Sequence, residues 1–392
     1  MKEYDIIIIG ASAAGISAAE HARKVSDSLS IACLTEETRA AYYRPLLTEL
    51  MGNPQVVNKP AFTVRPASWF TERRVDLYTK ANVSMVDVHN HVIATQDGRE
   101  FSWKRCIFAT GSEPFVPLPE TLQLPGVFTC RTWADAEAIE QAARHATNVV
   151  VIGGGLLGLE AAHFLNTPGR LVTVIELMPR ILPRQLDEPV SQWFAQRIQK
   201  TGVRLLTSTQ VRAIEQTPAG TLRLETSSGE LTADVALFSI GVRPRVDLAK
   251  KANLTVNRGI VVDPTLRTSH PDVFACGDAA EFCGQVWALW MPAIRMGQVA
   301  GHNAAASKSE ERTYTPTLQP AALSAFSTRI FSVGRLEGEL EARLVDLDHG
   351  VHLYFENDVL VGALLWGDTT RGMTLVKAIE QKASRSTAVA LL

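Results

Sequence analysis

Residues 148–158 read NVVVIGGGLLG, an aliphatic run that passes directly into a glycine-rich turn. The pattern predicts a buried strand, a tight turn and a helix through about Leu165, followed by a second strand over Leu171–Ile175 and then Glu176. In such a unit the first glycine makes the turn, the second admits a pyrophosphate, and the third lets the helix pack closely. The helix N-terminus then faces the anion. The expected binding residues are Gly153, Gly155, Leu156, Leu157, Gly158 and Glu176.

The same unit occurs a second time, at the start of the chain. Residues 4–9 (YDIIII) lead into residues 10–15 (GASAAG), a helix through about Lys24, a strand over residues 29–34, and Glu36. Serine replaces the usual second glycine, and its small side chain still permits close approach of a phosphate. The expected binding residues are Gly10, Ser12, Ala13, Ala14, Gly15 and Glu36. Two units in register predict an α/β fold with two Rossmann-like dinucleotide-binding domains.

The acid that ends each second strand is placed to accept hydrogen bonds from ribose hydroxyls. Glu176 would repel the 2′-phosphate of NADPH, so the second unit favours NADH. Arg180 lies four residues further on and is able to soften that preference.

Bulk properties exclude several other classes of protein. The chain has 392 residues, of which 46% are hydrophobic and 20% are charged, with a formal net charge of −2. Two or three domains are expected, without an electrostatic reason to bind nucleic acid. We find neither a signal-type segment nor an apolar run of about 20 residues, so a cytoplasmic protein without membrane contact is expected. His89 and His91 are interpreted as surface residues, and no metal site is predicted.

Three further segments carry a resemblance to a known family: CIFATG (106–111), FSIGVRP (238–244) and VFACGD (273–278). In this order with the two glycine turns, they resemble the pyridine nucleotide-disulfide oxidoreductase superfamily over about residues 4–300. The resemblance implies glutathione-reductase-type domains, FAD in the first and NADH in the second. It also implies cofactor contacts, which are expected from Ala109, Thr110, Gly111, Gly241 and Asp278. Asp278 has a simpler alternative role as a helix cap.

The resemblance implies three domains. The FAD domain comprises residues 1–117 and 246–315, the NADH domain is inserted as residues 118–245, and residues 316–392 form a small α+β domain. Within the superfamily, the chain is most similar to NADH:rubredoxin and flavorubredoxin reductases, with the flavin part of assimilatory nitrite reductases next. A monomer or weak dimer is expected.

The segment Ala41–Gly52 contains no cysteine, although disulfide reductases of the superfamily carry their redox pair there. Thiol-disulfide exchange needs a thiolate, so electrons are expected to leave from the flavin itself. The five cysteines form no Cys-x-x-Cys pair and are expected to be single buried thiols.

Arg44 and Pro45 fall where relatives place a basic residue and proline against the flavin. We expect Arg44 to stabilise charge on the reduced ring and to pair with Glu160, so Arg44, Pro45 and Glu160 are the candidate catalytic residues. The alternative is a surface salt bridge or a capping pair. Trp290 and Trp366 are candidates for lining the flavin, although aromatic residues are more often part of the core.

The expected activity is hydride transfer from NADH to FAD, followed by electron transfer to a small redox protein such as rubredoxin or flavorubredoxin. Two other classes remain open. One is a direct NADH oxidase or quinone-type reductase, and the other is a flavin-binding assembly or signalling protein without turnover.

Overall fold

The computed structural model describes residues 1–58, 62–344 and 348–392. Its first domain is built on a sheet with the strand order β3-β2-β1-β6-β5-β4, to which β18 adds by pairing with β6. The strands β3, β2, β1, β6 and β18 are parallel, and β4 and β5 are antiparallel. Their bounds are β1 Lys2–Ile9, β2 Ile31–Leu34, β3 Val75–Tyr78, β4 Val83–Asp87, β5 Val92–Thr95, β6 Glu100–Phe108 and β18 Val273–Ala275.

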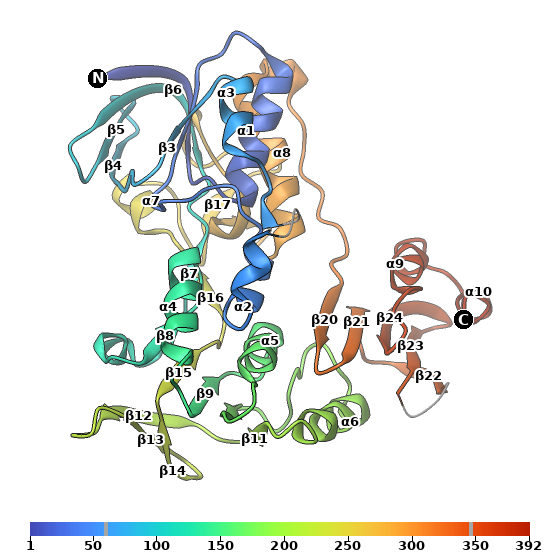
Figure 1. Cartoon of the computed structure of the whole chain (residues 1–392). Coiled ribbons are helices and arrows are strands. Elements are labelled where there is room, and N and C mark those ends of the chain that lie inside the picture. The colour runs from blue at the N-terminus through green and yellow to red at the C-terminus, as the bar shows by residue number, and fades with distance from the viewer. Residues whose placement is uncertain (59–61, 345–347) are drawn as a thin grey trace.

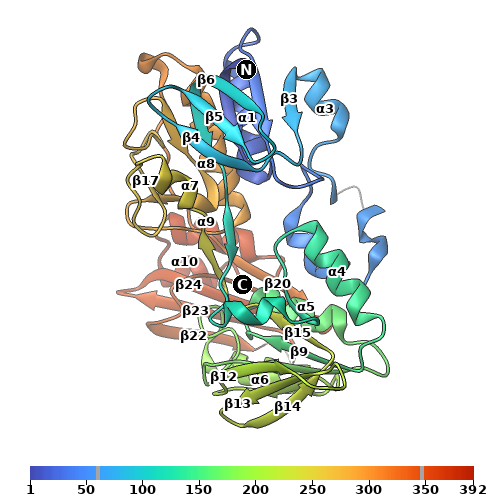
Figure 2. The ribbon, with the colours of Figure 1, turned by 90° about the vertical axis from the view of Figure 1, so that its left-hand side faces the viewer.

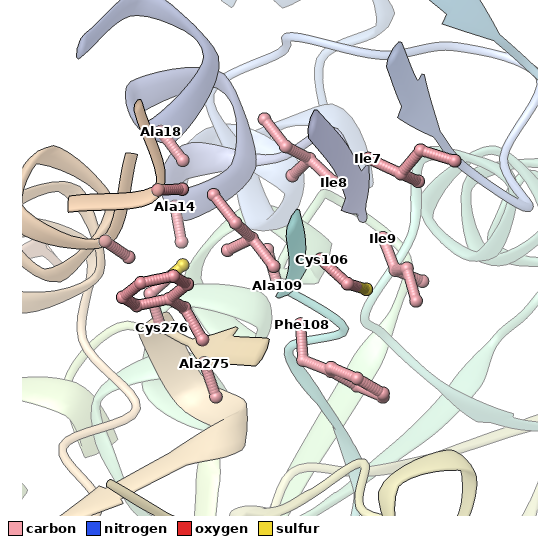
Figure 3. Close-up of a cluster of buried hydrophobic side chains, with 14 of the residues drawn as sticks. Ile7, Ile8, Ile9, Ala14, Ala18, Cys106, Phe108, Ala109, Ala275 and Cys276 are labelled. Atoms are coloured by element: carbon pink, nitrogen blue, oxygen red, sulfur yellow. The ribbon is translucent and has the colours of Figure 1, made fainter. Parts of the chain in front are cut away.

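Two helices far apart in sequence, α1 (Ala13–Val25) and α8 (Trp290–Ala305), lie side by side against this sheet (Figure 1). A Cβ on Gly301 would lie 2.0 Å from the Ala18 carbonyl oxygen, so the two helices touch through their backbones. Figure 3 shows buried side chains on both sides of β6: Ala14, Ala18 and Cys276 lie on the side of the two helices, and Cys106 lies on the other side with Ile9. This packing joins residues from the two ends of the chain into one domain.

The second domain has an entirely parallel sheet with the order β11-β10-β9-β15-β8. These strands are β8 Val127–Thr129, β9 Asn148–Ile152, β10 Leu171–Ile175, β11 Arg204–Leu206 and β15 Val235–Phe238. The helices are α4 Trp133–Ala143, α5 Leu156–Leu165 and α6 Glu188–Gln199. An antiparallel meander, β12 Val211–Gln216, β13 Leu222–Thr226 and β14 Gly229–Ala233, lies at the end of the molecule opposite the first sheet (Figure 2).

The chain crosses between the two domains twice, and the crossings pair with each other. β7 (Ser112–Pro114) and β16 (Val242–Pro244) form a two-stranded antiparallel ribbon between the two large sheets (Figure 1). The domain boundaries expected near residues 117 and 245 lie close to this ribbon and stay a prediction.

Shorter elements complete these domains: α2 Leu47–Leu50, α3 Ala67–Glu72, α7 Asp247–Lys251, β17 Ile260–Val262, β19 Ala280–Phe282, and the 3₁₀ turns η1 Arg44–Leu46, η2 Pro54–Asn58, η4 Pro119–Gln123, η5 Gly277–Ala279 and η6 Lys308–Glu310.

The C-terminal domain is an antiparallel sheet with the order β20-β21-β24-β23-β22 and two helices. Its elements are β20 Ala321–Ala325, β21 Thr328–Gly334, β22 Glu339–Leu344, β23 Gly350–Glu356, β24 Val359–Trp366, α9 Gly372–Glu380 and α10 Arg385–Val389. The helix α9 ends at Glu380, and Lys382, two residues further on, adopts a left-handed φ of +54°. The predicted architecture, two Rossmann-like domains and a small α+β C-terminal domain, is confirmed.

Candidate functional site

The first glycine turn joins β1 to α1 and leaves no room for side chains at two positions. Gly10 has a φ of +117°, and a Cβ there would lie 2.1 Å from the Ala109 carbonyl oxygen. A Cβ on Gly15 would lie 1.9 Å from the Gly10 carbonyl oxygen. These contacts require glycine. They bring the N-terminus of α1, which begins with Ala13 and Ala14, to the carboxyl edge of the sheet.

Ser12 is the N-cap residue of α1 and has a partner that the sequence did not predict. Its Oγ accepts a hydrogen bond from Nε of Arg44 at 2.9 Å. Arg44 begins the turn η1, in which Pro45 is the second residue. The serine is therefore the attachment point for the guanidinium of Arg44 as well as a small residue at a phosphate turn.

A cavity of about 510 Å³ lies beside this turn. Its volume falls in the range of small-molecule and cofactor sites. Residues of the first glycine turn, of the turn after β6 and of the second domain crossing line it, among them Gly10, Ser12, Glu36, Arg44, Gly111 and Arg245. The glycine turn and the N-terminus of α1 both lie beside this cavity. This arrangement fits the phosphates of a dinucleotide.

Thr110 and Gly111 form the turn after β6 and hold the second domain crossing. The Thr110 hydroxyl donates to the Arg245 carbonyl oxygen at 3.0 Å, and the Arg245 N–H donates to the Gly111 carbonyl oxygen at 2.9 Å. The guanidinium of Arg245 forms an ion pair with Glu36. Glu36, the expected ribose ligand, therefore lies on the cavity wall with one carboxylate oxygen already paired.

Asp278 lies in the turn after β18 and is mostly buried, with 11% of its side chain exposed. It accepts a hydrogen bond from the Ser112 hydroxyl at 2.8 Å and one from Nη2 of Arg131 at 2.7 Å. Arg131 belongs to the segment expected in the NADH domain, and it also lines the cavity. Sequence reasoning missed Arg131, because only the fold brings it to a residue 147 positions away.

Arg44 does not form the ion pair expected from the sequence. Its guanidinium pairs with Glu37 and donates to the Arg131 carbonyl oxygen at 2.5 Å, while Glu160 has a different partner. The expectation of an Arg44–Glu160 pair is therefore wrong, because Glu37, seven residues along the chain, reaches the guanidinium first. Both members are mostly buried, with 17% and 14% of their side chains exposed. Burial lowers the pKa of Arg44, but electrostatic interactions with Tyr42 and Glu37 outweigh this effect and hold the pKa above its usual value.

The second glycine turn repeats the geometry of the first. Gly153 has a φ of +120°, and a Cβ there would lie 2.2 Å from the Ser239 carbonyl oxygen. A Cβ on Gly158 would lie 2.0 Å from the Gly153 carbonyl oxygen. Gly155 differs, because a Cβ there would have no protein atom within 4 Å. The middle glycine thus borders open space. Because it has no side chain, a pyrophosphate could approach its backbone closely there.

The remaining predicted residues of this unit lie around that opening. Leu156 and Leu157 begin α5, and 52% of Leu157 is exposed. Gly241, in the turn after β15, has a φ of +107° and also borders open space. The carboxylate of Glu176 is fixed at the edge of the turn, because it accepts hydrogen bonds from the N–H of Gly154 at 2.7 Å and of Met178 at 2.8 Å.

Arg180 is turned away from Glu176. Its guanidinium donates to the carbonyl oxygens of Leu186 and Pro183 in the loop that follows. A guanidinium held by two backbone oxygens is not free to receive a 2′-phosphate, so this residue gives no sign of softening the NADH preference.

Glu160 accepts a hydrogen bond from the Thr48 hydroxyl at 3.1 Å. This contact joins α5 to α2, and the two helices touch closely, since a Cβ on Gly52 would lie 2.1 Å from the Phe164 carbonyl oxygen. Burial raises the pKa of Glu160 to about 7, and the threonine hydrogen bond offsets only part of that effect. A carboxyl group that is half ionised near neutral pH is able to accept or release a proton.

The two tryptophan candidates have different surroundings. Trp290 begins α8 and packs edge-on against Tyr43, with ring centroids 4.8 Å apart. Trp366 is 4% exposed and lies between Trp193 and His352. Because Trp366 is enclosed by these side chains, the expectation that it lines the flavin is wrong, and it is a core residue of the C-terminal sheet.

The cysteines and histidines take no part in this site. Burial raises the pKa of Cys33, Cys130 and Cys276 to about 12, and that of Cys106 further still. Cys283 is exposed in the turn after β19, contrary to the expectation of buried thiols.

Within residues 1–58, 62–344 and 348–392, no cluster of three potential metal ligands is found. Nor does any helix in those ranges have the length and apolarity to cross a membrane.

Fold and site together define a dinucleotide-dependent flavoprotein oxidoreductase. The chain belongs to the pyridine nucleotide-disulphide oxidoreductase family, whose model matches residues 4–297. A second model, the rubredoxin NAD+ reductase C-terminal domain, matches residues 321–383. The family is FAD-dependent and uses NADH, so the cofactors predicted from the sequence are confirmed as those of the family.

Two curated relatives and one solved structure illustrate this membership. The assimilatory nitrate reductase electron transfer subunit of Bacillus subtilis is 29% identical over 97% of this chain, and the chain spans about half of that protein (49%). The rubredoxin-NAD(+) reductase of Pseudomonas putida is 31% identical over 70% of this chain and 71% of its own length. A NAD-dependent persulfide reductase from A. fulgidus shares the fold, with a TM-score of 0.88 at 24% identity over 98% of this chain and 78% of that chain.

Proposed function

We propose that this chain takes electrons from NADH through FAD and delivers them to a small redox protein of the rubredoxin type. One observation carries the proposal. The segment 41–52 bridges the two nucleotide turns, because Arg44 bonds to Ser12 at the first and Thr48 bonds to Glu160 just after the second. This segment contains no cysteine, so a thiol relay between NADH and the acceptor has no nucleophile there.

When bound, FAD supplies two-electron acceptance from a nicotinamide and one-electron release to an acceptor. The residues of the chain then bind the two dinucleotides and orient them. The first turn with Glu36, Thr110, Gly111 and Asp278 would hold FAD, and the second turn with Glu176 and Gly241 would hold NADH. Arg44 places a fixed cation beside the first turn, and Glu160 offers a carboxyl group whose proton is exchangeable near neutral pH.

The acceptor class is supported by the C-terminal domain, which matches the model named for rubredoxin reductases. A second candidate has its own support. The chain matches an electron transfer subunit of nitrate reductase over almost its whole length, yet spans only about half of that protein. In that case the acceptor would be a redox centre of a larger assembly.

Steady-state NADH oxidation with rubredoxin, a [2Fe–2S] ferredoxin, a quinone and oxygen, compared side by side, tests the proposal. We expect rubredoxin to give the highest kcat/KM, and the Glu160→Gln variant to lower it while leaving NADH binding measurable. Fastest turnover with oxygen or quinone would mean a direct oxidase or quinone reductase. No turnover with any acceptor, together with a long-lived NADH complex, would mean a binding or signalling role.

A further inference from the structure

Arg245 is held at the junction of the second domain crossing and the first nucleotide cavity. Its backbone is fixed on both sides to the turn after β6, through the Thr110 hydroxyl at 3.0 Å and the Gly111 carbonyl oxygen at 2.9 Å. It directly follows β16, which forms the ribbon between the two large sheets (Figure 1). The position of its side chain is therefore set by the domain crossing.

The side chain of Arg245 pairs with Glu36, and both residues line the cavity. Nη1 pairs with Oε1 of Glu36, whereas Oε2 of Glu36 accepts no hydrogen bond in the described part of the chain. Nε of Arg245 is buried and has no hydrogen-bond partner among the described residues, since Oε2 of Glu113 is 3.9 Å away. A buried N–H without a hydrogen-bond partner is costly for the folded chain, so its presence on a cavity wall points to a ligand that accepts from it.

We propose that Arg245 binds the adenosine-phosphate half of the dinucleotide in the first cavity. Nη1 holds Glu36 so that Oε2 faces the ribose hydroxyls, and Nε donates to an oxygen of the ligand. Because Arg245 belongs to the crossing, retention of the dinucleotide and the connection between the two domains depend on the same residue. This rests on the proposed FAD site, but not on any electron acceptor.

A solvent-exposed salt bridge with no ligand role is the competing reading, since 35% of Arg245 and 41% of Glu36 is exposed. Exposed pairs contribute little to stability. The neighbouring ion pair between Arg243 and Glu113 offers a matched control, because 66% of Arg243 is exposed and its Nε is satisfied by Glu113 at 2.7 Å.

The test compares the wild type with Arg245→Gln, Arg245→Lys and Arg243→Gln. FAD dissociation is followed by flavin fluorescence, without NADH or acceptor, and the apoprotein is titrated with ADP and with FMN. ADP carries the adenosine-phosphate half of FAD, and FMN carries the flavin half. We expect Arg245→Gln to speed FAD release about tenfold and to weaken ADP binding by a similar factor, with FMN binding unchanged. Arg245→Lys should recover part of the loss, and Arg243→Gln should behave as wild type.

Two outcomes would overturn the inference. Unchanged FAD release and ADP binding in Arg245→Gln would make the pair a surface salt bridge. Equal weakening of ADP and FMN would mean general damage to the domain. Since no acceptor is present, neither outcome bears on which protein receives the electrons.

Discussion

Oγ1 of Thr48 donates a hydrogen bond to Glu160 at 3.1 Å, across the contact between α2 and α5. In the described part of the chain Glu160 has no cationic partner, because Arg44 is engaged by Glu37. The carboxyl group is consequently stabilised in its neutral form by burial.

This predicts a pH-dependent stability. In the folded state the pKa of Glu160 is about 7, above the value of 4.5 expected for the unfolded chain. The unfolded state therefore ionises first, and the contribution to stability falls as the pH rises from about 4.5 to about 7. Glu160→Gln removes this titration, so the variant should gain about 2 kcal/mol relative to wild type between pH 5 and pH 8. Urea unfolding of both proteins at pH 5 and pH 8 measures the difference in the free energy of unfolding between variant and wild type. An equal difference at the two pH values would contradict the raised pKa.

Arg44→Met should affect both stability and flavin reduction. Among the described residues, the substitution leaves the buried Glu37 carboxylate with the Tyr42 hydroxyl as its one side-chain partner, at 2.5 Å, so the free energy of unfolding should fall by about 3 kcal/mol. Reduction of the flavin by NADH, measured by anaerobic stopped flow on FAD-loaded protein, should slow by about tenfold or more. Glu37→Gln serves as the control for the lost ion pair. An unchanged reduction rate in Arg44→Met would remove Arg44 from the catalytic residues.

Glycine substitutions in the second turn should separate binding from folding. Gly155→Ala places its Cβ in open space and should unfold like wild type, yet weaken NADH about tenfold by blocking close approach of the pyrophosphate. Gly158→Ala would bring its Cβ within 2.0 Å of the Gly153 carbonyl oxygen and should lose stability by about 1–3 kcal/mol or more. Normal NADH affinity in Gly155→Ala would exclude this turn as the phosphate site.

The choice of nicotinamide cofactor should depend on Glu176 and not on Arg180. We expect kcat/KM for NADH to exceed that for NADPH by about a hundredfold in the wild type, and Glu176→Ser to reduce this ratio by about tenfold. Arg180→Ala should leave the ratio unchanged, because the guanidinium is held by Leu186 and Pro183. A shift of the ratio in Arg180→Ala would show that the loop releases this arginine when NADPH binds.

Local patterns were enough to predict the two nucleotide units. The helix after the second turn ends at Leu165 and the next strand spans residues 171–175, both as predicted, since glycine spacing and aliphatic runs act over short stretches of chain. Two other arginines at the first cavity, Arg131 and Arg245, could not be predicted. Arg131 meets Asp278, and Arg245 meets Glu36, only because the inserted domain returns the chain to the first sheet.

The wrong expectations have a similar cause. The partner of Arg44 was sought at the second turn, whereas Glu37 lies seven residues away and shares its wall of the cavity. Trp366 was placed at the flavin from its position near the end of a strand. The side of the sheet that it faces is decided by packing against Trp193, which no local pattern encodes.

An anaerobic titration of the FAD-loaded protein with NADH tests the central claim most directly, that the flavin is the one redox group between NADH and the acceptor. The segment 41–52 has no cysteine, and burial keeps four of the five thiols protonated. We expect complete reduction at about two electron equivalents per FAD. Uptake of about four, with new reactive thiols after reduction, would contradict it, because a disulfide would then share the electrons with the flavin.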